Sequence, residues 1–139
     1  MVTKVRDIMS PAPVCMADTE SVSAAAQAMK QHGIGNVLVL TDGQLSGLVT
    51  DRDITIRVLA DGRDPLTTAI GDICSTELVL LGPDDDVTQA AALVRELAVR
   101  RFPVVQVGVP VGVVSIGDLA LEREARSALS GVSAAPPNA

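Results

Sequence analysis

The chain has 139 residues, a net charge of −6 and a hydrophobic fraction of 47%, with Phe102 as its one aromatic residue. This length and apolar content suffice for one domain, or for two small subdomains that share a core, without disulfides or a structural metal. The acidity argues against nucleic-acid binding, and because we find neither a bilayer-length apolar run nor a signal peptide, we expect a cytoplasmic protein.

An internal repeat governs the organisation of the chain. The sequence from Val5 to about Arg57 recurs without a gap 65 positions later, so that residue 7 aligns with residue 72. The matched pairs are Asp7-Ile8 with Asp72-Ile73, Val14 with Val79, Val22 with Val87, Ala25-Ala26 with Ala90-Ala91, Val39 with Val104, Gly43 with Gly108, Gly47 with Gly112 and Asp53 with Asp118. The chain therefore contains two copies of one supersecondary unit.

Each copy opens with a short apolar segment, at residues 13–16 and 77–81, which predicts a strand. Acidic and hydroxyl residues follow at 18–21 and 84–86, where their side-chain oxygens would cap a helix. Apolar residues spaced i, i+3, i+4 and i+7 then predict a helix with one buried face. These residues are Val22, Ala25, Ala26 and Met29 in the first copy, and Val87, Ala90, Ala91 and Val94 in the second.

The first of these helices should end at His32-Gly33, because glycine is favoured just past a helix C-terminus. A hairpin turn is expected at Thr41-Asp42-Gly43, since an Asp-Gly pair tolerates positive φ angles. The other predicted elements are strands at 37–40, 45–50 and 102–105 and helices over about 51–60 and 117–127. Each copy thus has the order strand, helix, strand, strand, helix. A single copy would expose its sheet, so we expect a mixed α/β fold with the two copies packed about a pseudo-twofold axis.

The passage from the second hairpin strand into the last helix carries the most informative residues. It reads Gly47-Leu48-Val49-Thr50-Asp51-Arg52-Asp53-Ile54 in one copy and Gly112-Val113-Val114-Ser115-Ile116-Gly117-Asp118-Leu119 in the other. This pattern resembles the signature of cystathionine beta-synthase (CBS) domains, which has glycine, two apolar residues, Thr or Ser, two variable residues and Asp. Residues 100–105 look like the family's Arg-x-Pro strand entry, and residues 5–9 look like its usual opening.

The resemblance implies a tandem CBS pair, similar to the stand-alone CBS proteins of the actinobacterial hypoxic response group. Residues 1–60 and 70–127 would be its two domains, 61–69 the linker and 128–139 a disordered tail. The family's usual ligands are AMP, ADP, ATP or S-adenosylmethionine, bound at two related sites in a cleft between the sheets. The resemblance also implies a homodimer formed through the helices.

The motif residues suit such a ligand chemically. Thr50 and Ser115 stand where a strand passes into a helix, so their hydroxyls and the helix's free backbone N–H groups can receive a phosphate oxygen. Asp53 and Asp118 would accept the hydroxyls of a ribose. The candidate cations for phosphate are Arg52, Arg100 and Arg101. The candidate adenine wall consists of Val14, Val37, Leu38, Val79 and Phe102.

A simpler interpretation of the same residues stays open. Thr50 with Asp53, and Ser115 with Asp118, also fit an ordinary capped helix N-terminus. Arg52, between Asp51 and Asp53, could belong to a solvated ion network.

The two copies also differ beside the motif. Gly35-Asn36 replaces Arg100-Arg101, and Leu38 replaces Pro103, so the two sites are unequal. If one site alone is occupied, we favour Thr50 and Asp53 with the Arg100-Arg101 pair.

The remaining reactive residues predict no chemistry of their own. Cys15 and Cys74 lie in apolar contexts and are expected to be buried small hydrophobes, and His32 a polar helix-end residue. No catalytic triad, metal-ligand cluster or phosphate-binding loop is present, so we expect neither an enzyme nor a resident cofactor or metal. The expected function is regulatory, with a signal passed to an unknown protein partner or through the oligomeric state. The alternative is a ligand-free dimeric scaffold or interaction protein.

Overall fold

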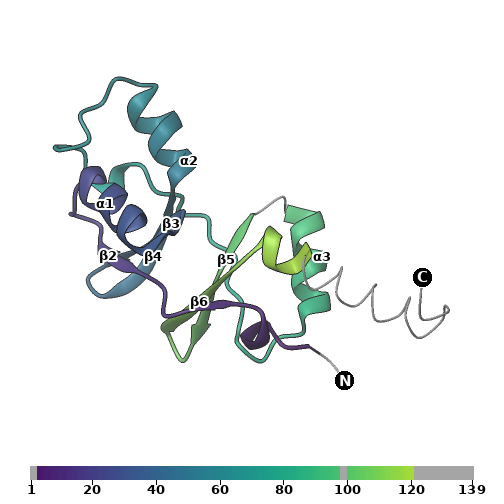
Figure 1. The fold of residues 1–139 in the computed structure, drawn as a ribbon. Coiled ribbons are helices and arrows are strands. Elements are labelled where there is room, and N and C mark those ends of the chain that lie inside the picture. The colour runs from purple at the N-terminus through teal and green to yellow at the C-terminus, as the bar shows by residue number, and fades with distance from the viewer. Residues whose placement is uncertain (1–2, 98–99, 121–139) are drawn as a thin grey trace. The chain divides into compact units, whose positions relative to one another are not determined.

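The computed structural model describes residues 3–97 and 100–120 and has the predicted mixed α/β fold, with two sheets and helices (Figure 1). The described residues form two compact units. The first, which we call the Thr50 unit, contains residues 12–79 and 107–110. The second, the Ser115 unit, contains the described residues of 3–11, 80–106 and 111–120.

The Thr50 unit contains the complete first copy of the predicted element order. Its elements are β2 (Cys15–Ala17), α1 (Val22–His32), β3 (Asn36–Thr41), β4 (Gln44–Thr50), α2 (Asp51–Ile54), the π-helical turn η2 (Thr55–Leu59) and the 3-10 helix η3 (Ile70–Asp72). The sheet order is β2-β3-β4, with β3 parallel to β2 and antiparallel to β4. The predicted helix at 51–60 is confirmed, with its second half in the wider π geometry.

Helix α1 begins and ends at residues that the sequence indicates. The Ser21 hydroxyl accepts a hydrogen bond from the Ala24 N–H at 3.1 Å, and Gly33 ends the helix in the left-handed conformation, with φ 65°. Val22, Ala25 and Met29 are buried in a core to which β3, β4, η2 and the η3 segment also contribute. The prediction was wrong for Ala26, which is exposed. The buried stripe is centred between Val22 and Ala25. Ala26, four residues after Val22, therefore lies at the edge of the stripe.

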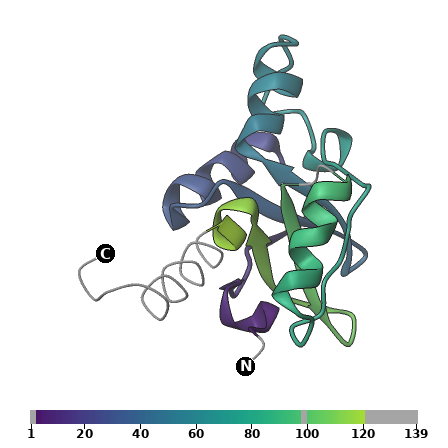
Figure 2. The same cartoon turned by 90° about the vertical axis from the view of Figure 1, so that its right-hand side faces the viewer.

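The Ser115 unit repeats this architecture, but its equivalent of β2 is reduced to an isolated bridge at Leu81. Its elements are η1 (Val5–Asp7), β1 (Ser10–Pro11), α3 (Val87–Leu97), β5 (Arg101–Gln106), β6 (Val109–Ser115), of which residues 111–115 belong to this unit, and helical residues 116–120. The sheet order is β1-β6-β5, and Figures 1 and 2 show α3 beside these strands. The continuation of the last helix to 127, the tail at 128–139 and the side chain of Val94 lie outside the residues that the structure describes.

The strand predicted at 77–81 is the main correction to the predicted fold. Only Leu81 pairs there, as an isolated parallel bridge to Val104. In the other copy, the Leu38 N–H donates to the Val14 carbonyl at 2.9 Å and so extends the pairing of β2 with β3. Pro103 replaces Leu38 and has no N–H to give to Val79, so the corresponding ladder begins later.

The two copies exchange the segments that precede their first strands. The Val5 N–H donates to the Asp85 carbonyl at 2.9 Å, and the equivalent Ile70 N–H donates to the Glu20 carbonyl at 2.8 Å. Each compact unit therefore contains a segment that belongs by sequence to the other copy.

This exchange explains the first glycine of each motif. A Cβ on Gly47 would lie 2.6 Å from the Cys74 sulfur, and one on Gly112 would lie 2.5 Å from the Met9 sulfur. Met9 and Cys74 occupy equivalent positions of the repeat, so in each unit the exchanged segment crosses the sheet where only glycine leaves room.

Both hairpins turn through two residues with positive φ. Asp42 and Gly43 have φ values of 52° and 80°, and Val107 and Gly108 have φ values of 50° and 76°. The Asp-Gly hairpin is confirmed. Val107 is unusual because β-branched residues rarely occupy the left-handed region.

Candidate functional site

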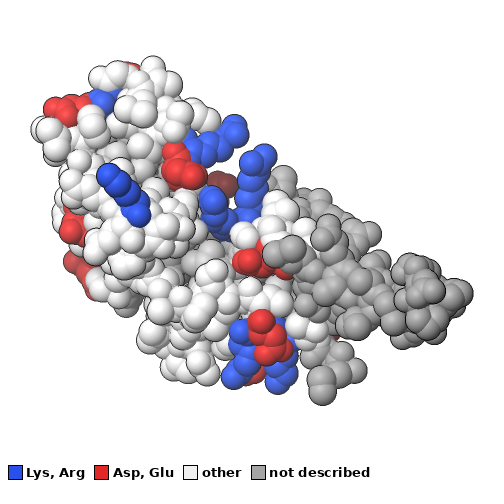
Figure 3. Space-filling model, viewed as in Figure 1, with Lys and Arg blue, Asp and Glu red and all other residues white. Residues whose placement is uncertain are grey.

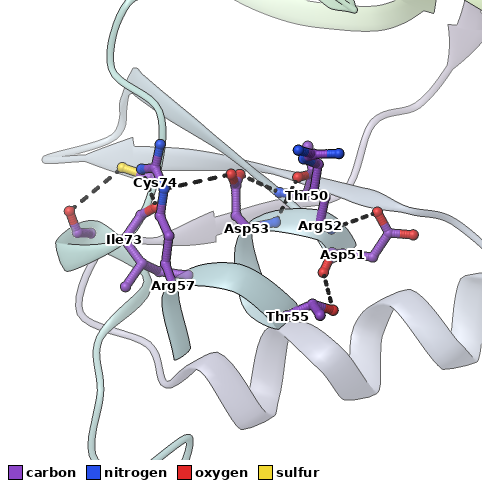
Figure 4. A network of polar contacts seen from close by, with 9 residues as sticks. Thr50, Asp51, Arg52, Asp53, Thr55, Arg57, Ile73 and Cys74 are labelled. Carbon is purple, nitrogen blue, oxygen red and sulfur yellow. Dashed lines mark hydrogen bonds and ion pairs between the residues drawn. The ribbon is translucent and has the colours of Figure 1, made fainter. Parts of the chain in front are cut away.

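The Thr50 motif forms a reciprocal capping box at the start of α2 (Figure 4). The Thr50 hydroxyl accepts a hydrogen bond from the Asp53 N–H at 3.1 Å, and the Asp53 Oδ2 accepts one from the Thr50 N–H at 2.9 Å. The helix-capping interpretation is therefore correct for this motif. Because a hydroxyl that accepts a bond can still donate one, and because a carboxylate has further lone pairs, the box retains hydrogen-bonding capacity.

The Ser115 motif has the same geometry in the other unit. The Ser115 hydroxyl accepts a hydrogen bond from the Asp118 N–H at 3.1 Å, and the Asp118 Oδ2 accepts one from the Ser115 N–H at 2.8 Å. The sequence repeat is thus also a repeat of side-chain geometry. Each copy fixes one hydroxyl and one carboxylate side by side at the N-terminus of a helix.

Arg57 is a residue of this site that sequence reasoning missed. Its Nε lies 3.9 Å from the Asp53 Oδ1, and its Nη1 donates a hydrogen bond to the Ile73 carbonyl at 3.0 Å (Figure 4). The Asp53 side chain is 15% exposed, whereas that of Arg57 is 50% exposed. The spacing of an Asp and an Arg four residues apart on a helix is the signal that could have identified the pair.

Cys74 lies beside this ion pair and is held by the turn before it. Its thiol donates to the Gly71 carbonyl at 3.5 Å. Burial raises the pKa of the Cys74 thiol, and the charge of Asp53 acts in the same direction, whereas Arg57 opposes it. A raised thiol pKa means less thiolate at neutral pH, and hence lower nucleophilicity.

The sequence predicts that both cysteines are buried small hydrophobes, and the structure shows that neither is fully buried. Cys74 is half-buried against the core, and Cys15 is exposed. Cys15 occupies an outward position of the short strand β2, in which only the middle residue, Met16, turns inward. His32 is exposed at the end of α1, in agreement with its predicted role.

Arg52 does not take part in the ion pair of this segment, which joins Asp53 to Arg57. Its side chain is exposed and lines a shallow, open depression together with Asp51, Thr55 and Ile56. The Asp51 carboxylate accepts a hydrogen bond from the Arg52 N–H at 2.8 Å, and the Asp51 carbonyl accepts one from the Thr55 hydroxyl at 3.1 Å. The Arg52 side chain is therefore accessible to an anion in solvent.

The structure brings Arg100 to the Ser115 motif. The Ile116 N–H donates to the Arg100 carbonyl at 2.9 Å, so the chain at Arg100 lies beside the start of the helix that follows Ser115. The equivalent bond in the other copy runs from the Asp51 N–H to the Gly35 carbonyl at 3.0 Å. Arg100 and Arg101 belong to the Ser115 unit, whereas Thr50 and Asp53 belong to the Thr50 unit. Their combination in one site stays a prediction.

The candidate adenine wall is largely inaccessible in this structure. Val37, Leu38 and Phe102 are 0% exposed. Val14 and Val79 are half-buried, and Val14 packs against the core cluster that contains Val37. Of the five apolar candidates, only these last two offer surface to a ligand.

Figure 3 shows charged side chains of both signs on the face drawn. The mixed cluster near η1 consists of Lys4, Arg6 and Asp84, with an Arg6–Asp84 hydrogen bond and a Lys4–Asp84 ion pair of 3.5 Å. The hydrogen bond from Arg6 lowers the pKa of Asp84. Within residues 3–97 and 100–120, no three His, Cys, Asp or Glu side chains form a group that could hold a metal ion, and no helix is long and apolar enough to cross a membrane.

Comparison with known proteins identifies the family. The model of the CBS domain matches residues 5–60 and again residues 70–124. The chain belongs to the CBS domain family. A curated relative, the CBS domain-containing protein YhcV of Bacillus subtilis, is 36% identical over 135 residues, which cover 94% of this chain and 96% of YhcV. Hypoxic response protein 1 of Mycobacterium tuberculosis is 35% identical over 119 residues, with coverages of 85% and 83%.

Solved structures extend the likeness to the fold. The CBS domain pair of protein MJ0100, crystallised in complex with 5′-methylthioadenosine and S-adenosyl-L-methionine, superposes with a TM-score of 0.78 at 25% identity. The match covers 91% of this chain and 99% of the MJ0100 chain. The predicted resemblance to tandem, stand-alone CBS proteins is therefore confirmed.

Proposed function

We propose that this CBS pair is a regulatory module that binds an adenine nucleotide, meaning AMP, ADP, ATP or S-adenosylmethionine. Its occupancy would be read by a protein partner or through the module's own oligomeric state. The observation that carries the proposal is the duplicated capping box, which holds a hydroxyl and a carboxylate side by side at two helix N-termini. The complex of the MJ0100 CBS pair with two adenosyl ligands supports the choice of ligand class.

The chemistry of the box suits the polar part of such a ligand. The Asp53 Oδ2 already accepts the Thr50 N–H, so a ribose hydroxyl would donate to the remaining lone pairs of the carboxylate. A phosphate oxygen would meet the helix N-terminus and a hydroxyl donor at Thr50 or Ser115. The guanidinium groups of Arg52, Arg100 and Arg101 are the cations we propose for phosphate.

A second candidate function, a ligand-free dimeric scaffold, is favoured by a different observation. The hydroxyl and carboxylate of each capping box already accept backbone N–H groups of the chain itself, and most of the proposed adenine wall is buried. In addition, Ile56, Leu59 and Leu66 in the Thr50 unit expose 47%, 63% and 72% of their surface. A contiguous patch of such side chains would mark a site of protein association.

Isothermal titration calorimetry distinguishes the two functions, and the lack of Trp and Tyr makes it preferable to intrinsic fluorescence. The wild-type protein is titrated with each of the four ligands, followed by the Asp53→Asn and Asp118→Asn variants. An Asn side-chain oxygen can still accept the N–H of Thr50 or Ser115, so both variants should keep the helix cap. Asp61→Asn, in the exposed linker, is the matched control.

The proposal expects binding by the wild-type protein and the control, with a loss of at least about tenfold in affinity for one of the two site variants. Absence of heat with all four ligands, from folded protein free of co-purified nucleotide, would favour the scaffold instead.

A further inference from the structure

The Asp53 carboxylate is held from two sides. Its Oδ2 accepts the backbone N–H of Thr50 at 2.9 Å, and its Oδ1 faces the Arg57 Nε at 3.9 Å. A single bond to Oδ2 opposes rotation of the carboxylate about its Cβ–Cγ bond only by the modest net strength of that one bond. The guanidinium on the opposite side restricts that rotation, because the cation attracts the second oxygen.

Arg57 is itself anchored by a segment from the other copy of the repeat. Its Nη1 donates to the Ile73 carbonyl at 3.0 Å. The segment around Ile73 is fastened to the Thr50 unit on both sides, by the Ile70 N–H at one end and by paired backbone bonds of Ser75 with Leu48, at 2.9 and 3.0 Å, at the other. The guanidinium therefore has a fixed support and a defined direction (Figure 4).

We propose that Arg57 is a positioning residue for ribose recognition by Asp53. This role rests on the proposed function of the same site. A ribose presents two neighbouring hydroxyls, and a carboxylate that receives both must keep its plane turned toward the sugar. Arg57 fixes that plane, and it acts through Asp53 rather than by touching the ligand. The site should accordingly prefer a ribonucleotide to its 2′-deoxy form, with Arg57 setting the size of the preference.

The role belongs to one motif only. Position 122, which corresponds to Arg57 in the repeat, is a glutamate and lies outside the described residues. The second copy thus lacks a cation at the position from which Arg57 acts on Asp53. A substitution of Arg57 changes the Thr50 motif and leaves the residues of the Ser115 motif untouched.

The test is a comparison of dissociation constants for ribo- and deoxyribonucleotides. AMP and ATP, each paired with its 2′-deoxy form, are titrated into the wild-type protein and into Arg57→Gln, Arg57→Lys and Arg63→Gln. Arg63 is an exposed arginine of the same unit and carries the same change in charge. Thermal melting of each variant separates loss of fold from loss of discrimination.

The proposal predicts that Arg57→Gln reduces the preference for ribose about two- to fivefold, that Arg57→Lys restores part of it, and that Arg63→Gln leaves it unchanged. An unchanged preference in folded Arg57→Gln overturns the role of Arg57 while leaving nucleotide binding intact. If Arg57→Gln does not fold, Arg57→Lys decides, because a shorter, non-planar cation should weaken the preference by itself. Failure of the wild-type protein to bind AMP, ADP, ATP and S-adenosylmethionine in the calorimetric titrations overturns the proposed function, and this role with it.

Discussion

The Thr50 hydroxyl and the Asp53 carboxylate each accept the other's backbone N–H, at 3.1 and 2.9 Å. This reciprocal pair begins the helix that follows β4, and Ser115 and Asp118 repeat it after β6. The residues that identify the family thus have a structural role at the start of a helix, and their substitution should affect folding.

Removal of the Thr50 hydroxyl should destabilise the protein. We expect Thr50→Ala to lower the free energy of unfolding by about 1 kcal/mol, because the Asp53 N–H loses its acceptor. Thr50→Ser keeps the oxygen and should change it by less than about 0.5 kcal/mol. Urea denaturation followed by circular dichroism measures both, and equal stabilities for the two variants would contradict the capping role.

A substitution at the hairpin-tip residue Val107 should stabilise the protein. A valine at φ 50° is strained, whereas Asn tolerates the left-handed region. Val107 is 96% exposed, so its replacement costs no core packing. We expect Val107→Asn to raise the free energy of unfolding by about 1 kcal/mol. The reverse change at the equivalent position, Asp42→Val, should lower it, and the strain argument fails if both variants melt at the wild-type temperature.

Gly47→Ala should be destabilising by about 1–3 kcal/mol, because its Cβ would lie 2.6 Å from the Cys74 sulfur. Cys74→Ala removes that sulfur but not the Ser75 carbonyl at 3.1 Å. The double variant should therefore regain part of the loss, which a double-mutant cycle of unfolding free energies measures. Simple additivity of the two changes would mean that the close approach at Gly47 is not the cause.

The contribution of Asp84 to stability should depend on pH. The hydrogen bond from Arg6 lowers the pKa of Asp84 in the folded protein. The contribution is therefore fully present above the unfolded value of about 3.9 and is lost as the pH falls through the lower folded value.

The measurement for this prediction is the difference in melting temperature between wild type and Asp84→Asn. The difference should be larger at neutral pH than well below pH 4, and it should shrink with added salt because the cluster is exposed. A difference that is independent of pH would assign the effect to something other than the Arg6–Asp84 contact.

Local features of the fold were predictable because they depend on neighbouring residues. Ser21 and Gly33 mark the ends of α1, and Asp42-Gly43 marks the first hairpin, since capping and turn chemistry act over a few positions. The missing strand before Leu81 was predictable in principle, because Pro103 stands where Leu38 donates its N–H. Apolar content alone, on which the prediction relied, cannot reveal the loss of a partner's donor.

Long-range features were not predictable from one sequence. The sequence shows that Val5 is apolar, but it does not show that the Val5 N–H donates to the Asp85 carbonyl of the other copy. For the same reason, the hydrogen bond from Arg57 to the Ile73 carbonyl could not be predicted from the sequence. The Asp53–Arg57 ion pair could have been predicted, because the two residues are four apart on a helix. The motif residues themselves were found, because Thr50, Asp53, Ser115 and Asp118 recur at one offset.

Amide NMR can establish whether an adenine nucleotide binds at the capping boxes. The Asp53 and Asp118 N–H groups donate to the Thr50 and Ser115 hydroxyls, so their chemical shifts report on any ligand that approaches those oxygens. On addition of AMP, ATP or S-adenosylmethionine, we expect saturable shifts of at least one of these two amides, and none at the hairpin-tip residue Asp42. If the Asp53 and Asp118 amide shifts stay unchanged with every ligand, no adenine nucleotide binds at the capping boxes.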